Sequence, residues 1–340
     1  VKVWVTEAKV ALLGDYTGNI TAVVEDGLLK SITTTGGEIL IGRKAEETVT
    51  LKMDEAGKLL FREKDGGSTP IGSYGEFQLI NTATGGLAGT YKQEADLDLL
   101  GGDAQQWTAV GTFAGTFDGN GKAISNLYIN KSESWQGLFG YNNGTVKNVH
   151  IASGSVTGKD YVGGVVGENH GTITACSNSG TCAASDSHSV GGVVGLNYGP
   201  ITACSNTGSV SGNGNVGGVV GENFGAITAC YSTGPVTGNG NVGGVVGRNY
   251  GNSAIITACY NIGVVSGTSS VGGVAGTNSG AITACYYSQG GGGGTLFSSS
   301  QWPTAGGSPE WGTGDGSGSG NYWKNLGTPG GTTYPKLWWE

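Results

Sequence analysis

The sequence predicts an all-β protein whose main part is a right-handed parallel β-helix (solenoid) of about seven coils, with a small N-terminal β domain and end caps. Three observations favour this fold class. A glycine-rich block recurs every 26 to 29 residues, a spacing typical of solenoids. Each period holds short β-branched segments separated by glycine and asparagine. No segment has the 3.6-residue apolar period of a helical repeat.

The repeat consists of V-G-G-V-[VA]-G-x-N-x-G, then I-T-A-C, then a G-x-V-x-G-like stretch. The first block begins at Val162, Val190, Val216, Val242 and Val271. A turn with G-L-F-G at Gly137 precedes these five, and an incomplete turn begins at Gly115. We expect the three segments to form the three strands of one coil. Because each coil covers the next, stability is a sum of contacts between neighbours, and both ends need caps.

Composition excludes several classes of protein. Glycine accounts for 69 of the 340 residues and charged residues for 12%, but the 37% hydrophobic residues favour a packed core over disorder. The net charge is −8 and no basic cluster is present, so nucleic acid is not an expected partner. No run of about 18 apolar residues occurs, so no membrane span is expected in this chain.

The cysteines fall in columns of aliphatic residues. Five of them end the I-T-A-C segments, in the column that Val149 and Leu127 occupy in the earlier turns. The sixth, Cys182, shares a column with valines. We therefore expect reduced, buried cysteines that belong to a structural ladder, and neither a metal site nor a cofactor, since zinc sites use closely paired ligands. The five are Cys176, Cys204, Cys230, Cys259 and Cys285.

Two further columns predict side-chain stacks. Asparagine amides can donate and accept, so asparagines stacked about 4.8 Å apart can form a hydrogen-bonded ladder. The asparagine column consists of Asn142, Asn169, Asn197, Asn223, Asn249 and Asn278. The next column holds His170, Tyr198, Phe224 and Tyr250, so this histidine is expected in an aromatic stack and not at a catalytic centre.

The chain divides into three parts. Residues 1–66 lack the repeat and are predicted to form a small β-rich domain, a sandwich fragment or a fimbrillin-like module. Residues 67–290 are the β-helix, with a capping helix near 73–84 that begins at the capping-box sequence S-Y-G-E. Residues 291–340 are an aromatic-rich C-terminal cap, expected to lay its rings across the last coil.

The repeat blocks resemble the GLUG motif over about residues 70–340, including G-L-F-G at Gly137 and the ending Y-P-K-L-W-W-E. This resemblance implies a similarity to cell-adhesion proteins of gut Gram-negative bacteria. It implies an extracellular, cell-surface location, with outer-membrane anchoring through a segment missing from this chain. The motif also occurs in IgA-specific zinc peptidases, but none of the three histidines, His150, His170 and His188, begins their H-E-x-x-H motif.

Two functions remain open at this point. The first is a non-enzymatic adhesion or scaffold protein that binds a host or microbial surface glycan or glycoprotein through a repetitive face. The alternative is a polysaccharide lyase or glycoside hydrolase, for which Glu168 and Glu222, two coils and roughly 10 Å apart with Leu196 between them, offer an inverting carboxylate pair. The candidate binding residues are Tyr231, Tyr260, Tyr286, Glu168, Glu222, Arg248, Trp338 and Trp339.

Overall fold

The computed structural model describes residues 68–340, except 83–85, 104, 185–187, 290–292, 299, 306–310 and 317–319, and the backbone of five strands before them. Those strands are β1 (Lys2–Thr6), β2 (Lys9–Leu13), β3 (Ile20–Glu25), β4 (Leu28–Thr34) and β5 (Leu40–Ile41). β1 pairs antiparallel with β2 and parallel with β5, and β3 pairs antiparallel with β4. The other residues of the predicted 1–66 domain lie outside the described residues.

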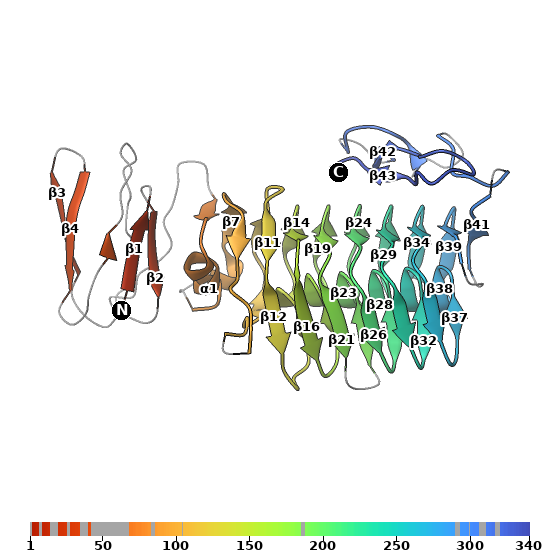
Figure 1. Ribbon diagram of the computed structural model, residues 1–340, viewed down its shortest axis with the longest axis horizontal. Coiled ribbons are helices and arrows are strands. Elements are labelled where there is room, and N and C mark those ends of the chain that lie inside the picture. Colours follow the sequence, from red (N-terminus) through yellow and green to blue (C-terminus); the bar gives the residue numbers. More distant parts are fainter. Residues whose placement is uncertain are drawn as a thin grey trace.

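The predicted parallel β-helix of about seven coils is confirmed (Figure 1). Each repeat contributes to five parallel sheets, which we number in the order in which one repeat enters them. Sheet 1 contains β17 (Val162–Gly163), β22 (Ser189–Gly191), β27 (Asn215–Gly217), β32 (Asn241–Gly243) and β37 (Val271–Gly272). Sheet 2 contains β9 (Val110–Phe113), β13 (Phe139–Asn142), β18 (Val166–Asn169), β23 (Val194–Asn197), β28 (Val220–Asn223), β33 (Val246–Asn249) and β38 (Ala275–Asn278).

The remaining three sheets follow in the same way. Sheet 3 contains β6 (Thr69–Ile71), β7 (Thr90–Gln93), β10 (Thr116–Asp118), β14 (Thr145–Lys147), β19 (Thr172–Thr174), β24 (Ile201–Thr202), β29 (Ala226–Thr228), β34 (Ile255–Thr257) and β39 (Ala281–Thr283). Sheet 4 contains β8 (Leu97–Asp98), β11 (Ala123–Ser125), β15 (His150–Ile151), β20 (Ser177–Asn178), β25 (Ser205–Asn206), β30 (Tyr231–Ser232), β35 (Tyr260–Asn261), β40 (Tyr286–Tyr287) and β41 (Thr295–Leu296). Sheet 5 contains β12 (Leu127–Asn130), β16 (Gly154–Gly158), β21 (Thr181–Ala184), β26 (Val210–Gly212), β31 (Val236–Gly238) and β36 (Val265–Gly267).

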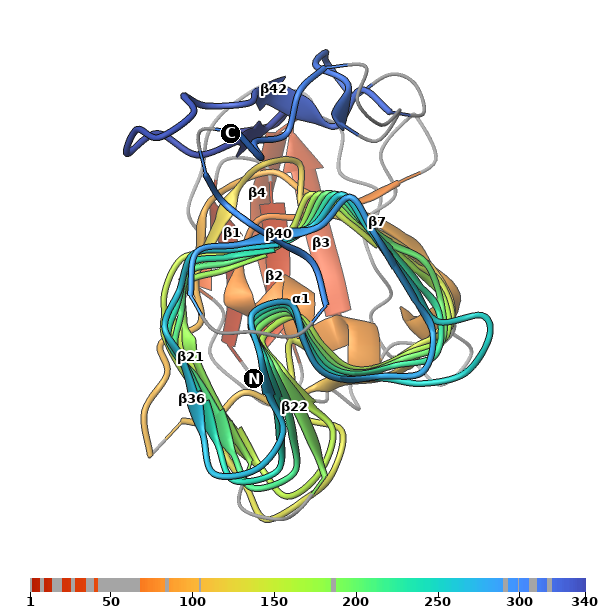
Figure 2. The same cartoon turned by 90° about the vertical axis from the view of Figure 1, so that its right-hand side faces the viewer.

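The hand of the solenoid is visible from its C-terminal end (Figure 2). The chain passes from sheet 3 at β7 to sheet 4 at β40, then to sheet 5 at β36 and sheet 1 at β22, which is counterclockwise in this view. Successive coils advance toward the viewer, since the C-terminal coils are nearest. The solenoid is therefore right-handed.

A full coil has five strands and not the three predicted from the repeat, because two segments bend in the middle. V-G-G-V-V-G turns at its paired glycines, where a side chain on Gly192 would lie 2.4 Å from the carbonyl oxygen of Gly218. I-T-A-C turns at its alanine, and Ala203 has a φ of 54°, in the left-handed region. Alanine signals no such corner in the sequence, since glycine and asparagine usually take this conformation.

A helix covers the first coils. α1 (Tyr74–Thr82) lies where the capping-box spacing placed it: the Glu76 backbone N–H donates to Ser73 Oγ at 3.2 Å, and Gly72 N–H donates to Glu76 Oε2 at 2.7 Å. Its Phe77 and Ile80 are fully buried, and the Phe77 ring stacks on Phe117 at 4.8 Å. A short 3-10 helix, η1 (Gly86–Ala88), follows. Within the described residues, no helix has the length and hydropathy needed to cross a membrane.

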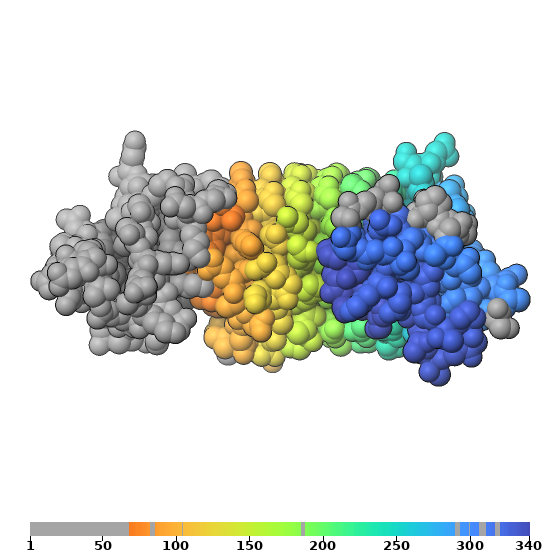
Figure 3. Space-filling model, turned by 90° about the horizontal axis from the view of Figure 1, so that it is seen from above, coloured from red at the N-terminus to blue at the C-terminus, as the bar shows by residue number. Residues whose placement is uncertain are grey.

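The C-terminal tail does not lie only across the last coil, which corrects the predicted position of its rings. β41 extends sheet 4, and Gly294 lies next to Val274 at that end. The chain then folds back along sheet 4 as a strap, which we define as the described part of residues 311–340, including the hairpin of β42 (Trp323–Asn325) and β43 (Lys336–Leu337) (Figures 1 and 3). Trp311 Nε1 donates to Ala284 O at 2.8 Å, and Trp339 Nε1 donates to Ala203 O at 2.9 Å, so the strap spans several coils.

Candidate functional site

The cysteine column lies in the core. All six cysteines are free and buried. Along the column each thiol sulfur after Cys176 accepts a weak hydrogen bond from the backbone N–H of the preceding cysteine, as Cys204 Sγ does from Cys176 at 3.4 Å. Burial raises the pKa of the Cys204 thiol well above its usual range, which opposes formation of a reactive thiolate. Within the described residues, no three His, Cys, Asp or Glu side chains are grouped so that they could hold a metal ion.

The asparagine column forms a continuous ladder inside the corner between sheets 2 and 3. Each side-chain amide nitrogen donates to the side-chain oxygen of the next asparagine at 2.7 or 2.8 Å, from Asn142 through to Asn278. The same nitrogen also donates to a backbone carbonyl of its own corner, as Asn197 does to Gly199 at 2.7 Å. Because their donors and acceptors are used within the scaffold, these amides have a structural role.

The tyrosine column of sheet 4, predicted to be an outward binding face, is covered by the strap. Tyr231 and Tyr260 are only 3% and 2% exposed, and their rings stack on each other at 4.8 Å. The Tyr260 hydroxyl donates to Pro335 O at 2.6 Å, and the Tyr231 hydroxyl donates to a Glu340 carboxylate oxygen. Tyr286 is half-buried against Phe297 at 5.3 Å. These tyrosines hold the strap and are not available to a ligand in this structure.

The two candidate tryptophans at the chain end both lie in the strap. Trp339 packs against His150 at 4.7 Å in addition to its hydrogen bond with Ala203. Trp338 is half-buried and lies against the backbone of Gly316. Trp339 therefore attaches the strap to the solenoid, whereas Trp338 packs within the strap.

An aromatic ladder of exposed and half-buried rings lies along another flank of the solenoid, at the C-terminal ends of the sheet 2 strands. His170 stacks between Tyr141 at 5.0 Å and Tyr198 at 4.5 Å, and Tyr198 stacks on Phe224 at 4.9 Å. The last ring, Tyr250, meets Phe224 edge to face at 5.8 Å. Tyr198 and Tyr250 are 44% and 47% exposed. We call these five rings the aromatic flank.

The charged residues of sheet 2 lie beside the aromatic flank. Glu222 forms an ion pair with Arg248 at 2.8 Å and accepts hydrogen bonds from Ser189 Oγ at 3.1 Å and Asn215 Nδ2 at 3.2 Å. The Arg248 guanidinium also lies 4.1 Å from the centre of the Tyr250 ring, a cation–π contact.

Glu168, the other half of the predicted carboxylate pair, is engaged separately. It accepts from the indole Nε1 of Trp135 at 2.7 Å and contacts His170 Nε2 at 2.8 Å. Leu196 separates the two glutamates in the column and is buried. Each carboxylate is thus held in its own network of neighbours.

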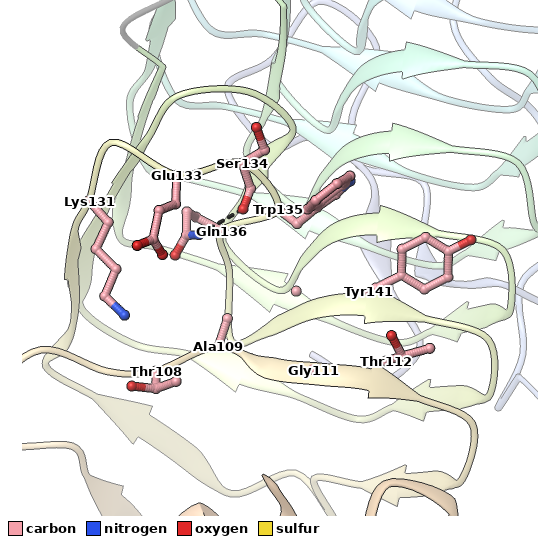
Figure 4. A pocket seen from close by; sticks show the side chains of 11 residues that line it. Thr108, Ala109, Gly111, Thr112, Lys131, Glu133, Ser134, Trp135, Gln136 and Tyr141 are labelled. Carbon is pink, nitrogen blue, oxygen red and sulfur yellow. Dashed lines mark hydrogen bonds between the residues drawn. The ribbon is translucent and has the colours of Figure 1, made fainter.

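A pocket of about 410 Å³ lies at the N-terminal end of the aromatic flank (Figure 4). Thr108 and Thr112 contribute from one coil, and Lys131, Glu133, Trp135, Gln136 and Tyr141 contribute from the next. Trp135 has a φ of 60° and is 48% exposed, so the backbone holds a large apolar ring at the surface in an unfavourable conformation. Such backbone strain is common at ligand sites.

Comparisons with known proteins bear on the fold. No protein-family model matches the chain. A solved structure from Bacteroides ovatus, provisionally named an immunoglobulin A1 protease, matches with a TM-score of 0.61 over 82% of this chain and 94% of that one, at 22% identity. This likeness shows the fold alone.

A curated relative matches in sequence. Halomucin of Haloquadratum walsbyi is 33% identical over 130 residues, which is 34% of this chain. The matched segment spans 1% of the length of halomucin.

Sequence reasoning missed Trp135, Tyr141 and Tyr161 as a group. Trp135 and Tyr161 each precede a sheet 1 position and have left-handed φ angles of 60° and 53°. Their rings lie nearly parallel, 6.4 Å apart. The sequence could have shown this, because Trp135 and Tyr161 lie the same number of residues before the glycine block that follows each of them. That spacing places the two residues in one column. An asparagine pair on sheet 4, where Asn178 donates to Asn206 at 3.0 Å, could have been found in the same way.

Proposed function

We propose that this protein is a cell-surface or extracellular adhesion or scaffold protein that binds surface glycans or glycoproteins along the aromatic flank. The proposal rests on one observation: five rings in successive coils form one row at the surface, each exposed or half-buried, while the strap covers the tyrosines of sheet 4. A contiguous row of partly apolar side chains on a soluble surface is typical of a binding site. The partial similarity to halomucin is compatible with a surface protein.

The chemistry of the row suits a neutral, hydroxyl-rich ligand. Burial raises the pKa of the Tyr198 hydroxyl, and the neighbouring Glu168 raises it further, so this hydroxyl remains a proton donor at neutral pH. Glu168, Glu222 and Arg248 add charged hydrogen-bonding groups beside the rings. Because an aromatic ring recurs in each of five successive coils, weak contacts with a repeating ligand would add, and many copies on a cell would multiply them.

The proposal includes the absence of catalysis. Glu222 is paired with Arg248, Glu168 is bonded to Trp135, and Leu196 lies between them. An inverting mechanism needs one carboxylic acid and one carboxylate facing a shared bond and a water molecule. Two carboxylates engaged with separate partners do not favour that arrangement.

A glycan array tests the proposal. We expect the wild-type protein to bind a subset of glycans and the double variant Tyr198→Ala/Tyr250→Ala to lose at least tenfold in apparent affinity. Thr237→Ala, an exposed change on sheet 5, is the matched control and should bind as the wild type does. No binding by the wild type, or equal binding by the double variant, would contradict the proposal. Cleavage of an array glycan that disappears in Glu222→Gln would favour the hydrolase or lyase alternative.

A further inference from the structure

Stacking limits which parts of the aromatic flank a ligand can reach. His170 and Tyr198 have neighbouring rings on both faces, so mainly their edges remain accessible. An aromatic face carries the negative part of the ring quadrupole and attracts the positively polarised C–H groups of a sugar ring. A sugar can therefore stack on a face only where the row ends.

One end of the row lies at the pocket, whereas at the other end the Arg248 guanidinium lies 4.1 Å from the centre of the Tyr250 ring. Tyr141 is the first ring, and only its C-terminal neighbour His170 is aromatic. On the other side, sheet pairing places Tyr141 beside Thr112, whose small side chain leaves the pocket open (Figure 4). A tyrosine face is thus available to a ligand here.

Trp135 provides a second apolar surface in the same pocket. Its Nε1 is fixed by Glu168 at 2.7 Å, and its C-terminal side faces Tyr161 at 6.4 Å. The pocket lies on its N-terminal side, where Thr108 and Ala109 belong to the preceding coil. Since the indole is already oriented, binding would not have to immobilise it, which favours affinity.

Polar groups surround these rings. Gln136 is 5% exposed and its Nε2 donates to Ser134 O at 2.8 Å, while its buried Oε1 has no hydrogen-bond partner among the described residues. Lys131 and Glu133 line the pocket with opposite charges. The pocket therefore offers donors and acceptors without a strong net charge, at a size in the lower part of the range typical of small-molecule sites.

We propose that this pocket binds one neutral pyranose ring, at the end or on a side branch of a glycan. The C–H face of the sugar packs against Trp135 and Tyr141, and its hydroxyls bond to Lys131, Glu133 and the acceptor of Gln136. This assignment rests on the proposed glycan-binding function. It also gives the bound glycan a direction along the solenoid: the pocket selects a terminal sugar, and the aromatic flank contacts the units that follow.

Saturation-transfer NMR with methyl pyranosides of glucose, galactose, mannose and N-acetylglucosamine tests the assignment. At least one of them should bind the wild type, with the strongest saturation on the protons of one ring face. Trp135→Ala and Thr112→Trp should each weaken this binding at least tenfold, the second by filling the pocket while Trp135 is kept. Thr237→Ala, an exposed change on sheet 5 far from the pocket and the aromatic flank, should leave it unchanged.

The outcomes separate this assignment from the proposed function. If array glycans bind but no pyranoside does, or if Thr112→Trp binds the pyranoside as the wild type does, the pocket assignment is wrong and the aromatic flank remains the binding surface. If neither array glycans nor pyranosides bind, the proposed function itself fails. Circular dichroism and the thermal transition of each variant show whether a loss of binding comes from unfolding.

Discussion

The side-chain nitrogen of Asn169 lies 2.8 Å from the side-chain oxygen of Asn197, one coil further along, and this contact repeats along the solenoid. Replacing Asn197 by alanine would remove one of the two acceptors of the Asn169 side-chain nitrogen, one of the two donors to the Asn223 side-chain oxygen, and the side-chain donor to Gly199 O, all in the core. Each buried polar group left unpaired costs about 1–3 kcal/mol. We expect Asn197→Ala to lower the free energy of unfolding by about 2–5 kcal/mol in urea denaturation.

Asn239 provides the matched control, because it makes the same kind of amide bond to Asn213 at 2.8 Å on the exposed surface. Water can replace that bond, so Asn239→Ala should cost under about 1 kcal/mol. Equal losses for the two variants would mean that the ladder does not stabilise the coils.

The core valines should tolerate no charge. Val219 is fully buried between neighbouring coils, and an unpaired carboxylate there costs several kcal/mol. We expect Val219→Asp to unfold the middle coils and to lower the melting temperature strongly. Arg248→Ala, which removes one partly exposed ion pair, should cost about 1 kcal/mol or less. Similar melting temperatures would show that the inside and outside faces are assigned wrongly.

Thiol accessibility follows from burial. Because all six cysteines are buried and free, a thiol reagent should label native protein slowly and should reach six labels per chain after denaturation. Mass spectrometry of the labelled protein counts the modified sites. Disulfide-linked peptides, or rapid labelling of the native protein, would contradict this structure of the column.

Alkaline pH should destabilise the fold. Burial raises the pKa of five thiols, to about 12 for Cys182, whereas an unfolded thiol ionises near pH 8.5. The stability that these thiols contribute is therefore complete below about pH 8.5 and is lost as the pH rises above it, by up to about 1.4 kcal/mol per pH unit for each thiol.

The double variant Cys204→Val/Cys230→Val isolates this effect, since valine occupies the same column at Val149. Unfolding free energies measured from pH 7 to 10 should fall less steeply for the variant than for the wild type. Parallel curves would show that the cysteines do not cause the loss.

The chain end of the strap should detach when one of its two indole anchors, Trp339, is removed. Trp339 makes one hydrogen bond to Ala203 and packs on His150, so Trp339→Ala should expose the chain end and Tyr231. Limited proteolysis should then cut within residues 311–340 faster than in the wild type, while the β-helix stays intact. Lys324→Ala, whose ammonium bonds only at the surface to Glu340 O, is the control. Equal rates for the two variants would argue against this anchoring.

The repeat made most of the fold predictable. Columns such as that of Cys176 and Val149 identify inward positions directly, because a parallel β-helix places equivalent residues of successive coils side by side. The division of each coil into five strands was harder to predict from the sequence. The corner at Ala203 depends on an alanine in the left-handed region, which the surrounding packing holds in place.

The candidate site was predicted only in part. The Tyr231 column was expected to face outward. Its side chains do point out of the coil, but the strap covers them. Nothing in the strap shares the repeat, so its path along sheet 4 had no periodic signal. The pocket at Trp135 arises because Tyr141 pairs with the smaller Thr112 on the preceding coil. This difference in size between two coils is not visible in any single motif.

The strap fixes a distance along the solenoid. Its two indole anchors bond to Ala203 and Ala284, which occupy the same corner three coils apart. The strap therefore fixes the number of coils between these two points. A coil inserted or deleted there would move one anchor site by the rise of one coil, and the strap could no longer reach both sites. Because Trp339 also packs on His150, gene duplication could lengthen the solenoid without this penalty only before His150. The strap thus divides the repeats into a segment of fixed length and a segment free to vary.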